Sequence, residues 1–191
     1  MMIVRYAVME LAFTVRGIQL GCITGPAMFS VGRLDPATRL LIESTQMTPP
    51  CKVLDFGCAW GALSLALAKI YPTCVFEGTD INLDAIKLAK INAKRNNISN
   101  CTFYESNVYE KVNGNYDVIV CNPPQKAGKE MNKQIITKSI GHLNLNGSLW
   151  IVGRHNVGGK TMMGWMQETF GNAESAGKQG VFRVYRSVKI N

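Results

Sequence analysis

The sequence predicts a doubly wound, mostly parallel α/β sheet, and three observations lead to this prediction. Short apolar segments alternate along the chain with longer amphipathic segments, which is the order of strands joined by helices. Residues 116–121 (YDVIVC) form a nearly continuous apolar run, typical of a strand that is buried on both faces. The connections between segments are short, as expected for helices that pack back onto the sheet. In such a sheet, ligands bind at the carboxyl ends of the strands.

The individual elements follow from local signals. β-branched and apolar residues on both sides of Arg16 and Gly17 predict a hairpin over residues 3–24. Asp35 is a favoured N-cap residue and Pro36 suits a first helical position, so a helix is expected over 36–45. Further strands are expected at 52–56, 74–79, 102–105, 116–121, 148–153 and 181–189, and further helices at 62–70, 83–96, 130–142 and 161–170. We therefore expect an N-terminal β extension over 1–30 and one larger domain over 31–191.

Composition limits the class of protein. The chain has 191 residues, of which 47% are hydrophobic and 18% charged, which excludes a disordered chain. A chain of this length buries about 70% of its unfolded surface and needs no metal or disulfide to hold its core. The formal net charge is +8, and a protein this basic often binds a polyanion, above all nucleic acid. The pattern does not indicate an oligomeric state.

Membrane insertion, export and metal binding are not expected. No segment reaches the ~18 consecutive apolar residues of a spanning helix. Leu20-Gly21-Cys22 is weakly similar to a lipoprotein processing site, but charged residues interrupt the segment before it, so we expect a cytoplasmic protein. The six cysteines form no C-x-x-C pair and there are only two histidines, which argues against a zinc site and for a reducing environment.

A glycine-rich turn follows the strand expected at 52–56. Residues 55–61 (DFGCAWG) run from that strand into a helix, and glycines in such a turn let backbone amides approach a ligand closely. The glycine spacing is not the G-x-G-x-x-G of dinucleotide-binding proteins. Asp80 ends the next strand, about 20 residues later, where a carboxylate reaches ribose hydroxyl groups. The turn and the acid together predict a cofactor that contains a nucleoside.

This turn resembles the D-x-G-x-G-x-G motif of class I S-adenosylmethionine-dependent methyltransferases, with Ala59 at the middle glycine. Alanine adopts a positive φ less readily than glycine, and we expect the turn to tolerate it. The resemblance implies that Asp80 binds the ribose, that Asn107 binds the adenine edge, and that Asp55 organises the turn. Asn107 is also a residue type that caps turns. The implied S-adenosylmethionine site consists of Asp55, Gly57, Ala59, Gly61, Asp80, Ile81, Asn107, Val108 and Asn122.

A second motif, Asn122-Pro123-Pro124-Gln125, follows the strand expected at 116–121. The prolines fix φ and remove two backbone donors, which leaves the Asn122 amide oxygen and the Pro124 carbonyl as acceptors for the hydrogens of a planar amine. The motif resembles the N-P-P-[aromatic] sequence of methyltransferases that modify exocyclic amines or amide nitrogens, which implies a catalytic role for these four residues. Gln125 stands where such enzymes carry an aromatic residue that stacks on the flipped base.

The resemblance extends over residues 28–191, through the segments 28–35 (MFSVGRLD), 106–109 (SNVY), 122–130 (NPPQKAGKE) and 180–186 (GVFRVYR). These segments are similar to the "methyltransferase small domain" family. That family includes bacterial enzymes that methylate the exocyclic amine of guanine in small-subunit ribosomal RNA, and single-domain archaeal relatives. It implies a Rossmann-like class I fold with an antiparallel C-terminal strand.

Three functions remain open at this stage. The first is methylation of an exocyclic amine, guanine above all, in ribosomal or other structured RNA. The second is methylation of a protein glutamine amide, and the third is a non-catalytic RNA adaptor that binds the cofactor. The net charge and a set of candidate RNA-contacting residues favour RNA. These residues are Lys126, Lys129, Lys133 and Arg154. Residues 153–161 are similar to a phosphate-binding P-loop, but the spacing between the first glycine and Gly159-Lys160 is one residue too long.

Overall fold

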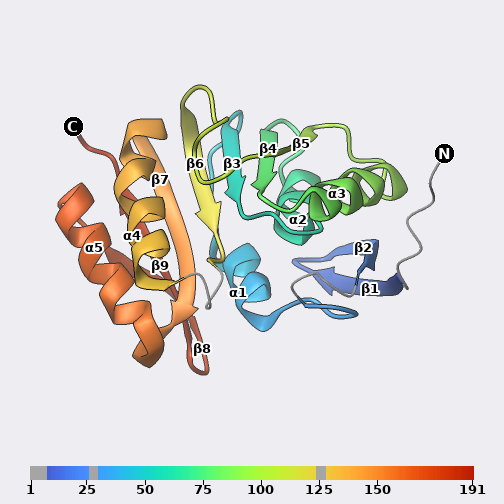
Figure 1. The fold of residues 1–191 in the computed structure, drawn as a ribbon, viewed down its shortest axis with the longest axis horizontal. Helices are drawn as coiled ribbons and strands as arrows, with labels where there is room; N and C mark the ends of the chain where they lie inside the picture. Colours follow the sequence, from blue (N-terminus) through green and yellow to red (C-terminus); the bar gives the residue numbers. More distant parts are fainter. Residues whose placement is uncertain (1–7, 26–29, 124–127) are drawn as a thin grey trace.

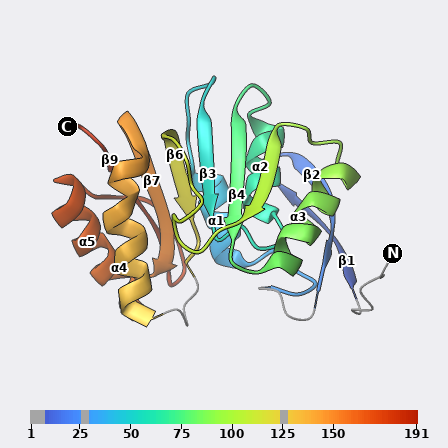
Figure 2. The same cartoon turned by 45° about the horizontal axis from the view of Figure 1, so that its top comes forward.

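The computed structural model describes residues 8–25, 30–123 and 128–191. The strands that follow the N-terminal hairpin are β3 (Lys52–Phe56), β4 (Val75–Asp80), β5 (Cys101–Glu105), β6 (Tyr116–Cys121), β7 (Leu143–Arg154), β8 (Glu174–Gln179) and β9 (Phe182–Val188). They form one seven-stranded sheet in the order β5–β4–β3–β6–β7–β9–β8, and its central strands lie side by side in Figure 2. All neighbours from β5 to β7 are parallel, whereas β9 is antiparallel to both β7 and β8. The predicted fold class is therefore confirmed.

Two groups of helices cover opposite faces of the sheet. The helices α1 (Pro36–Ser44), α2 (Ala62–Ile70) and α3 (Leu83–Arg95) share one core cluster, which contains Val118 and Val120 of β6. The helices α4 (Gly128–Ser139) and α5 (Lys160–Phe170) share a second cluster, which contains Ile119 and Cys121. Successive β6 side chains point to opposite faces, as they must in a strand, and both faces are covered, so the strand is apolar from Val118 to Cys121. Figure 1 shows α4 and α5 together at the β7 end of the sheet.

The N-terminal hairpin consists of β1 (Met9–Val15) and β2 (Ile18–Thr24), paired antiparallel. Its side chains belong to the same core cluster as α2 and α3. Buried Asn92 of α3 ties the hairpin to the domain: its Oδ1 accepts from Ile23 N at 2.8 Å, and its Nδ2 donates to Ile23 O and Trp60 O. The amide of Asn92 thus satisfies backbone groups of the hairpin and of the glycine turn at once.

The sequence prediction missed one strand and misplaced the boundaries of one helix and one further strand by more than one residue. β8 was not predicted, because it is an edge strand whose residues are exposed except for half-buried Gly177, so it shows no apolar alternation. The predicted helix over 130–142 is α4, from Gly128 to Ser139, followed by a separate 3₁₀ turn. β7 begins at Leu143 rather than at residue 148, because buried Leu143 pairs with Tyr116 before an irregularity in the ladder.

The order of the strands reverses direction between β3 and β6. From β3 the chain moves outward through β4 and β5, and it returns to the other side of β3 as β6. Phe56 pairs with Cys121, so Gly57 and Asn122 leave the sheet side by side at the carboxyl ends of their strands. Ligands of open α/β sheets bind at such a switch point. The two motifs found in the sequence therefore meet there.

Candidate active site at the carboxyl ends of β3 and β6

The glycine turn is anchored to the end of β4. The backbone N–H groups of Gly57 and Cys58 both donate to Thr79 O, each at 2.8 Å. Gly57, Ala59 and Gly61 all have positive φ, at 73°, 49° and 91°. No atom of the described residues lies within 4 Å of a Cβ added to Gly57, so this backbone borders open space in the described part of the chain. The turn thus presents its backbone to a free volume, as a binding cradle for a ligand requires.

A hydrogen bond joins Ala59 of the glycine turn to Asp80 at the end of β4. Ala59 lies in the left-handed region, which costs an alanine about 1 kcal/mol. Its N–H donates to Asp80 Oδ2 at 2.9 Å, while Asp80 Oδ1 accepts from Asn82 N at 2.9 Å. An ionised carboxylate has about four lone-pair sites, so Asp80 retains capacity for two further donors. Beside it the side chain of Ile81 is 66% exposed, an apolar surface at the end of a strand.

Asp55 is buried beneath the turn, with 1% of its surface exposed. Its Oδ2 accepts from Ser64 N at 3.1 Å and from Ser64 Oγ at 2.5 Å, which ties β3 to the first turn of α2. Burial raises the pKa of Asp55 to about 7, and the Ser64 hydrogen bonds offset part of this rise. The charge of Asp80 adds to the rise in pKa. Sequence reasoning had no signal for Ser64, which has no motif of its own.

Asn107 and Val108 follow β5 in the turn that starts at Ser106. Asn107 is exposed, and its Nδ2 donates to Glu110 Oε1 at 3.0 Å. Val108 has a φ of 49°, and its carbonyl accepts from Ser106 Oγ. The side chain of Asn107 thus bonds within its own turn, and its predicted contact with the adenine edge stays a prediction. Since Glu105 pairs with Asp80, the Asn107 turn also lies at the same edge of the sheet as Asp80.

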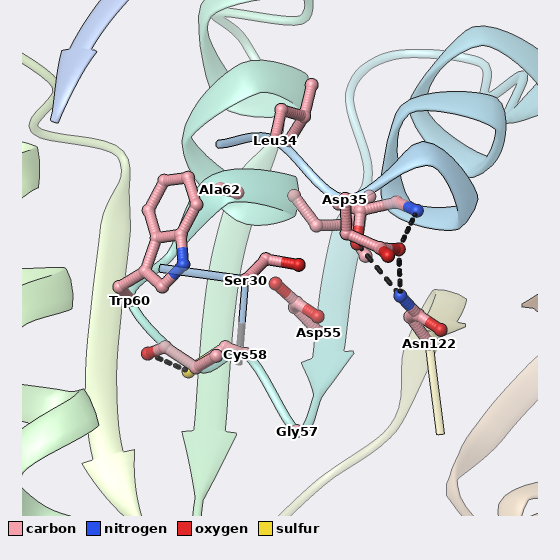
Figure 3. Close-up of a pocket in the computed structure, with 12 residues that line it drawn as sticks. Ser30, Leu34, Asp35, Asp55, Gly57, Cys58, Trp60, Ala62 and Asn122 are labelled. Carbon is pink, nitrogen blue, oxygen red and sulfur yellow. Dashed lines mark hydrogen bonds between the residues drawn. The ribbon is translucent and has the colours of Figure 1, made fainter. Parts of the chain in front are cut away.

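Asn122 is held by two residues of the α1 N-terminus (Figure 3). Its Nδ2 donates to Thr38 Oγ1 at 2.8 Å and to Asp35 Oδ2 at 3.0 Å. Both amide hydrogens are therefore in use, which fixes the orientation of the amide. Its carbonyl oxygen points away from α1 and has no hydrogen-bond partner among the described residues. Asp35 is the N-cap of α1, as predicted, but its contact with Asn122 and the role of Thr38 were missed.

Two cavities meet at Asn122. The smaller, of about 30 Å³, lies between the glycine turn and the α1 N-terminus (Figure 3). Besides Asn122, it is lined by Ser30, Asp35, Asp55, Gly57, Ala59 and Trp60, among others. The larger, of about 270 Å³, is bounded by residues of β7, α4, α5 and β9. Asn122 thus lines both the space beside the glycine turn and the larger space bounded by α4, α5, β7 and β9.

Some of the remaining predicted site residues line the larger cavity and others do not. Pro123 is buried, and it lines the larger cavity with Lys129 and Arg154. Lys133 is exposed on α4 and does not line either cavity. Three further predicted residues lie outside the described residues: Pro124, Gln125 and Lys126. The larger cavity also contains residues that sequence reasoning missed, namely Asn132, Trp165 and Phe182.

Two negative observations apply to the described part of the chain. Within residues 8–25, 30–123 and 128–191, no three His, Cys, Asp or Glu side chains come together in an arrangement suited to a metal ion. Among the helices of the same ranges, none has the length and apolar character needed to cross a bilayer.

Comparison with known proteins agrees with this arrangement. A sequence model of the family described as "Methyltransferase small domain" matches residues 19–186. The chain belongs to this family. A relative in Erwinia tasmaniensis, ribosomal RNA small subunit methyltransferase C, is 35% identical over 170 residues, which are 87% of this chain and 48% of the relative. The uncharacterized protein YbxB of Bacillus subtilis is 29% identical, over 94% of this chain and 90% of its own length.

Solved structures of methyltransferases share the fold. The 16S rRNA guanine N2 methyltransferase of Thermus thermophilus, solved with AdoMet and guanosine, superposes with a TM-score of 0.86 at 23% identity. The match covers 95% of this chain and 50% of that one. A methyltransferase from Pyrococcus furiosus superposes with a TM-score of 0.74 at 21% identity, over 89% of both chains. This methyltransferase small domain thus spans about half the length of the ribosomal RNA methyltransferase C that it matches.

Proposed function

We propose that this chain transfers a methyl group from S-adenosylmethionine to the exocyclic amine of a guanine in RNA. The observation that carries the proposal is the position of Asn122, which lines both cavities, has both amide hydrogens bonded, and has a carbonyl oxygen with no hydrogen-bond partner among the described residues. A carbonyl oxygen in that place accepts a hydrogen from an amine in the larger cavity. The amine nitrogen is then oriented toward a methyl group held on the side of the glycine turn.

The residues beside the glycine turn fit this cofactor. The open space in front of Gly57 admits the cofactor, and the remaining lone pairs of Asp80 accept from ribose hydroxyl groups. The exposed Ile81 side chain offers an apolar contact to a nucleoside, and Asn107 and Val108 lie at the neighbouring strand end. Asp55 and Gly61 shape the turn from below. When bound, S-adenosylmethionine supplies an electrophilic methyl group on a sulfonium.

Catalysis by this chain consists of positioning. Asn122 holds the amine through one hydrogen, and the Pro124 carbonyl is the second acceptor that the sequence provides. Pro123 and Pro124 restrict the backbone between these acceptors. Placing two reactants in attack geometry removes a large part of a methyl-transfer barrier, so no strong general base is required. The proton of the amine leaves to solvent after transfer.

An RNA substrate is supported by charge and by the relatives. Lys129 and Arg154 line the larger cavity, and Lys133 is exposed nearby on α4, in a chain with a net charge of +8. Relatives named as ribosomal RNA methyltransferases share up to 35% identity with this chain. The competing function is a non-catalytic RNA adaptor that binds the cofactor, and the glutamine at position 125 in place of an aromatic residue favours it.

The test is methyl transfer from labelled S-adenosylmethionine to ribosomal RNA from cells that lack the protein, followed by mass mapping of the nucleosides. We expect N2-methylguanosine at one position. Asn122→Ala should lower the rate constant about 100-fold, because misplacement by about 1 Å has this effect, while cofactor affinity stays within twofold. Asn122→Asp keeps an acceptor oxygen and should retain more activity than Asn122→Ala.

Other results separate the alternatives. Cofactor binding without transfer to any RNA would favour the adaptor, and transfer to a glutamine-containing peptide instead of RNA would identify a protein amide as substrate. Full activity of Asn122→Ala would mean that the Asn-Pro-Pro turn only ends a strand. RNA affinity should also depend on salt, and Lys129→Ala should flatten the slope of log affinity against log salt by about 0.7–0.9. Lys90→Ala, exposed on α3 and away from both cavities, is the matched control.

A further inference from the structure

We propose that the larger cavity is a nucleobase site in which Trp165 of α5 and Phe182 of β9 supply the aromatic surfaces that the Asn-Pro-Pro-Gln sequence lacks. The inference rests on the proposed function, because it names how the acceptor base is held. Both rings line the cavity that Asn122 and Pro123 also line. In this proposal the stacking surface comes from α5 and β9 rather than from the residue after the second proline.

The exposure of the tryptophans distinguishes Trp165 from the other two. Trp60 and Trp150 are 2% and 4% exposed and belong to the core. Trp165 is only half-buried, and the cavity lies against it. Phe182, also half-buried, lines the same cavity. Two half-buried aromatic rings that line a cavity of about 270 Å³ suit a flat, apolar ring with polar edges, which describes a nucleobase.

Close packing of α5 against β7 and β9 fixes the position of Trp165. A Cβ added to Gly153 at the end of β7 would collide with Met162 Cε of α5. A Cβ added to Gly159 would lie 2.7 Å from both Arg154 O and Tyr185 Oη. These two glycines let α5 start directly against β7 and β9. Trp165 lies three residues after buried Met162, close to one helical turn, so the same contacts fix its place in the cavity wall.

The charges beside the aromatic rings favour a nucleotide over a protein amide. The Arg154 guanidinium lies 5.7 Å from the centre of the Phe182 ring, within cation–π range, and Lys129 lines the same cavity. Cations at the edge of an aromatic cavity suit a base whose neighbouring phosphates remain outside. A glutamine side chain has no ring to stack and no phosphate to pair, so it would use neither feature.

The first experiment measures base binding without chemistry. Guanosine 5′-monophosphate is titrated into the protein saturated with S-adenosylhomocysteine, and tryptophan fluorescence is recorded, with ribose 5-phosphate as the probe without a base. We expect quenching by the nucleotide alone, and loss of that quenching in Trp165→Phe, whose remaining tryptophans are buried. Equal binding of ribose 5-phosphate, or equal quenching in Trp165→Phe, would overturn the base site.

The second experiment measures transfer to RNA. Trp165→Leu should raise the KM for RNA about 10- to 100-fold with unchanged cofactor affinity, whereas Trp165→Phe keeps a ring and should stay within about threefold. Met163→Leu, on the same helix but outside the cavity lining, is the control. Normal KM in Trp165→Leu, with RNA still methylated, would refute the base site and leave the proposed function standing. Trp165-dependent nucleotide binding without any transfer would refute the proposed function and leave the base site standing.

Discussion

The two sides of the switch point between β3 and β6 are built differently. The side proposed to bind the cofactor, here called the cofactor side, is defined as the carboxyl ends of β3, β4 and β5. Its candidate groups lie in short contiguous segments at or just after the ends of these strands, at 55–61, 80–81 and 107–108. On the acceptor side, defined as the larger cavity, the lining comes from α1, α4, β7, α5, β9 and the segment after β6. The first side is a set of local turns, and the second is an assembly of distant elements.

This difference explains why the residues of the cofactor side are easier to predict from the sequence than those of the acceptor side. The cofactor side is formed mainly by backbone amides and by residues with positive φ angles. These features depend on the spacing of glycines over a few residues. The acceptor side is formed by side chains from distant elements, and the packing of the helices brings these side chains together. Substitutions that affect one side and spare the other therefore test whether the two sides act separately.

The largest expected effect separates cofactor binding from transfer. Asp80→Ala removes the acceptor of Ala59 N and of the proposed ribose hydroxyl groups, so cofactor affinity should fall about 10- to 100-fold. The rate at saturating cofactor should change much less, because the acceptor side is intact. Calorimetry measures the affinity. Asp84→Ala is the control, since Asp84 pairs with Lys87 on the surface of α3. Unchanged affinity in Asp80→Ala would contradict the assignment of the cofactor side.

A second effect concerns the buried carboxyl beneath the glycine turn. Because burial raises the pKa of Asp55 to about 7, the folded protein keeps a proton that the unfolded chain loses near pH 4. The stability from this proton is complete below pH 4 and is lost as the pH rises through 7. The unfolding free energy should therefore fall by about 2 kcal/mol between pH 5 and pH 7 relative to Asp55→Asn. Urea unfolding at pH 5, 6, 7 and 8 measures it, and a difference that does not vary with pH would contradict the raised pKa.

A smaller effect is expected on the acceptor side. Thr38→Val removes one of the two acceptors of Asn122 Nδ2, which frees the amide to rotate. We expect the rate of transfer to fall about tenfold with cofactor affinity within twofold, and Thr38→Ser to restore the rate. Thr45→Val is matched in chemistry, since Thr45 is also a buried threonine of the α1 region, but its hydroxyl donates to Leu41 O and does not contact Asn122. Equal rates in Thr38→Val and Thr45→Val would show that Thr38 does not position Asn122.

The smallest effect concerns the backbone of the glycine turn. Ala59→Gly should raise stability by about 0.5–1 kcal/mol, because glycine adopts the φ of 49° without strain. Gly57→Ala should lower stability by a similar amount through its φ of 73°, since its Cβ would meet no atom of the described residues within 4 Å. Thermal unfolding of both variants provides the comparison. A loss of stability in Ala59→Gly would mean that the alanine methyl group packs usefully in the smaller cavity.

Much of the fold was predictable because it follows from short-range physics. The alternation of strands and helices, the doubly buried strand β6, the Asp35 N-cap and the paired signals of glycine turn and Asp80 all depend on neighbours in the sequence. β8 was not predictable, because its side chains are exposed and it exists only through its ladder with β9. An edge strand of this kind receives its conformation from its partner.

The sequence by itself determined that the two motifs lie at the carboxyl ends of strands. Only the tertiary structure decided that these strands, β3 and β6, are neighbours in the sheet. Only the tertiary structure decided how Asn122 is oriented, because Thr38 and Asp35 lie 84 and 87 residues away along the chain. Only the packing of α5 against β7 and β9 brought Trp165 and Phe182 to the same cavity as Asn122. Spacing along a chain predicts backbone turns, whereas contacts between side chains of distant elements depend on how the helices and the sheet fill space.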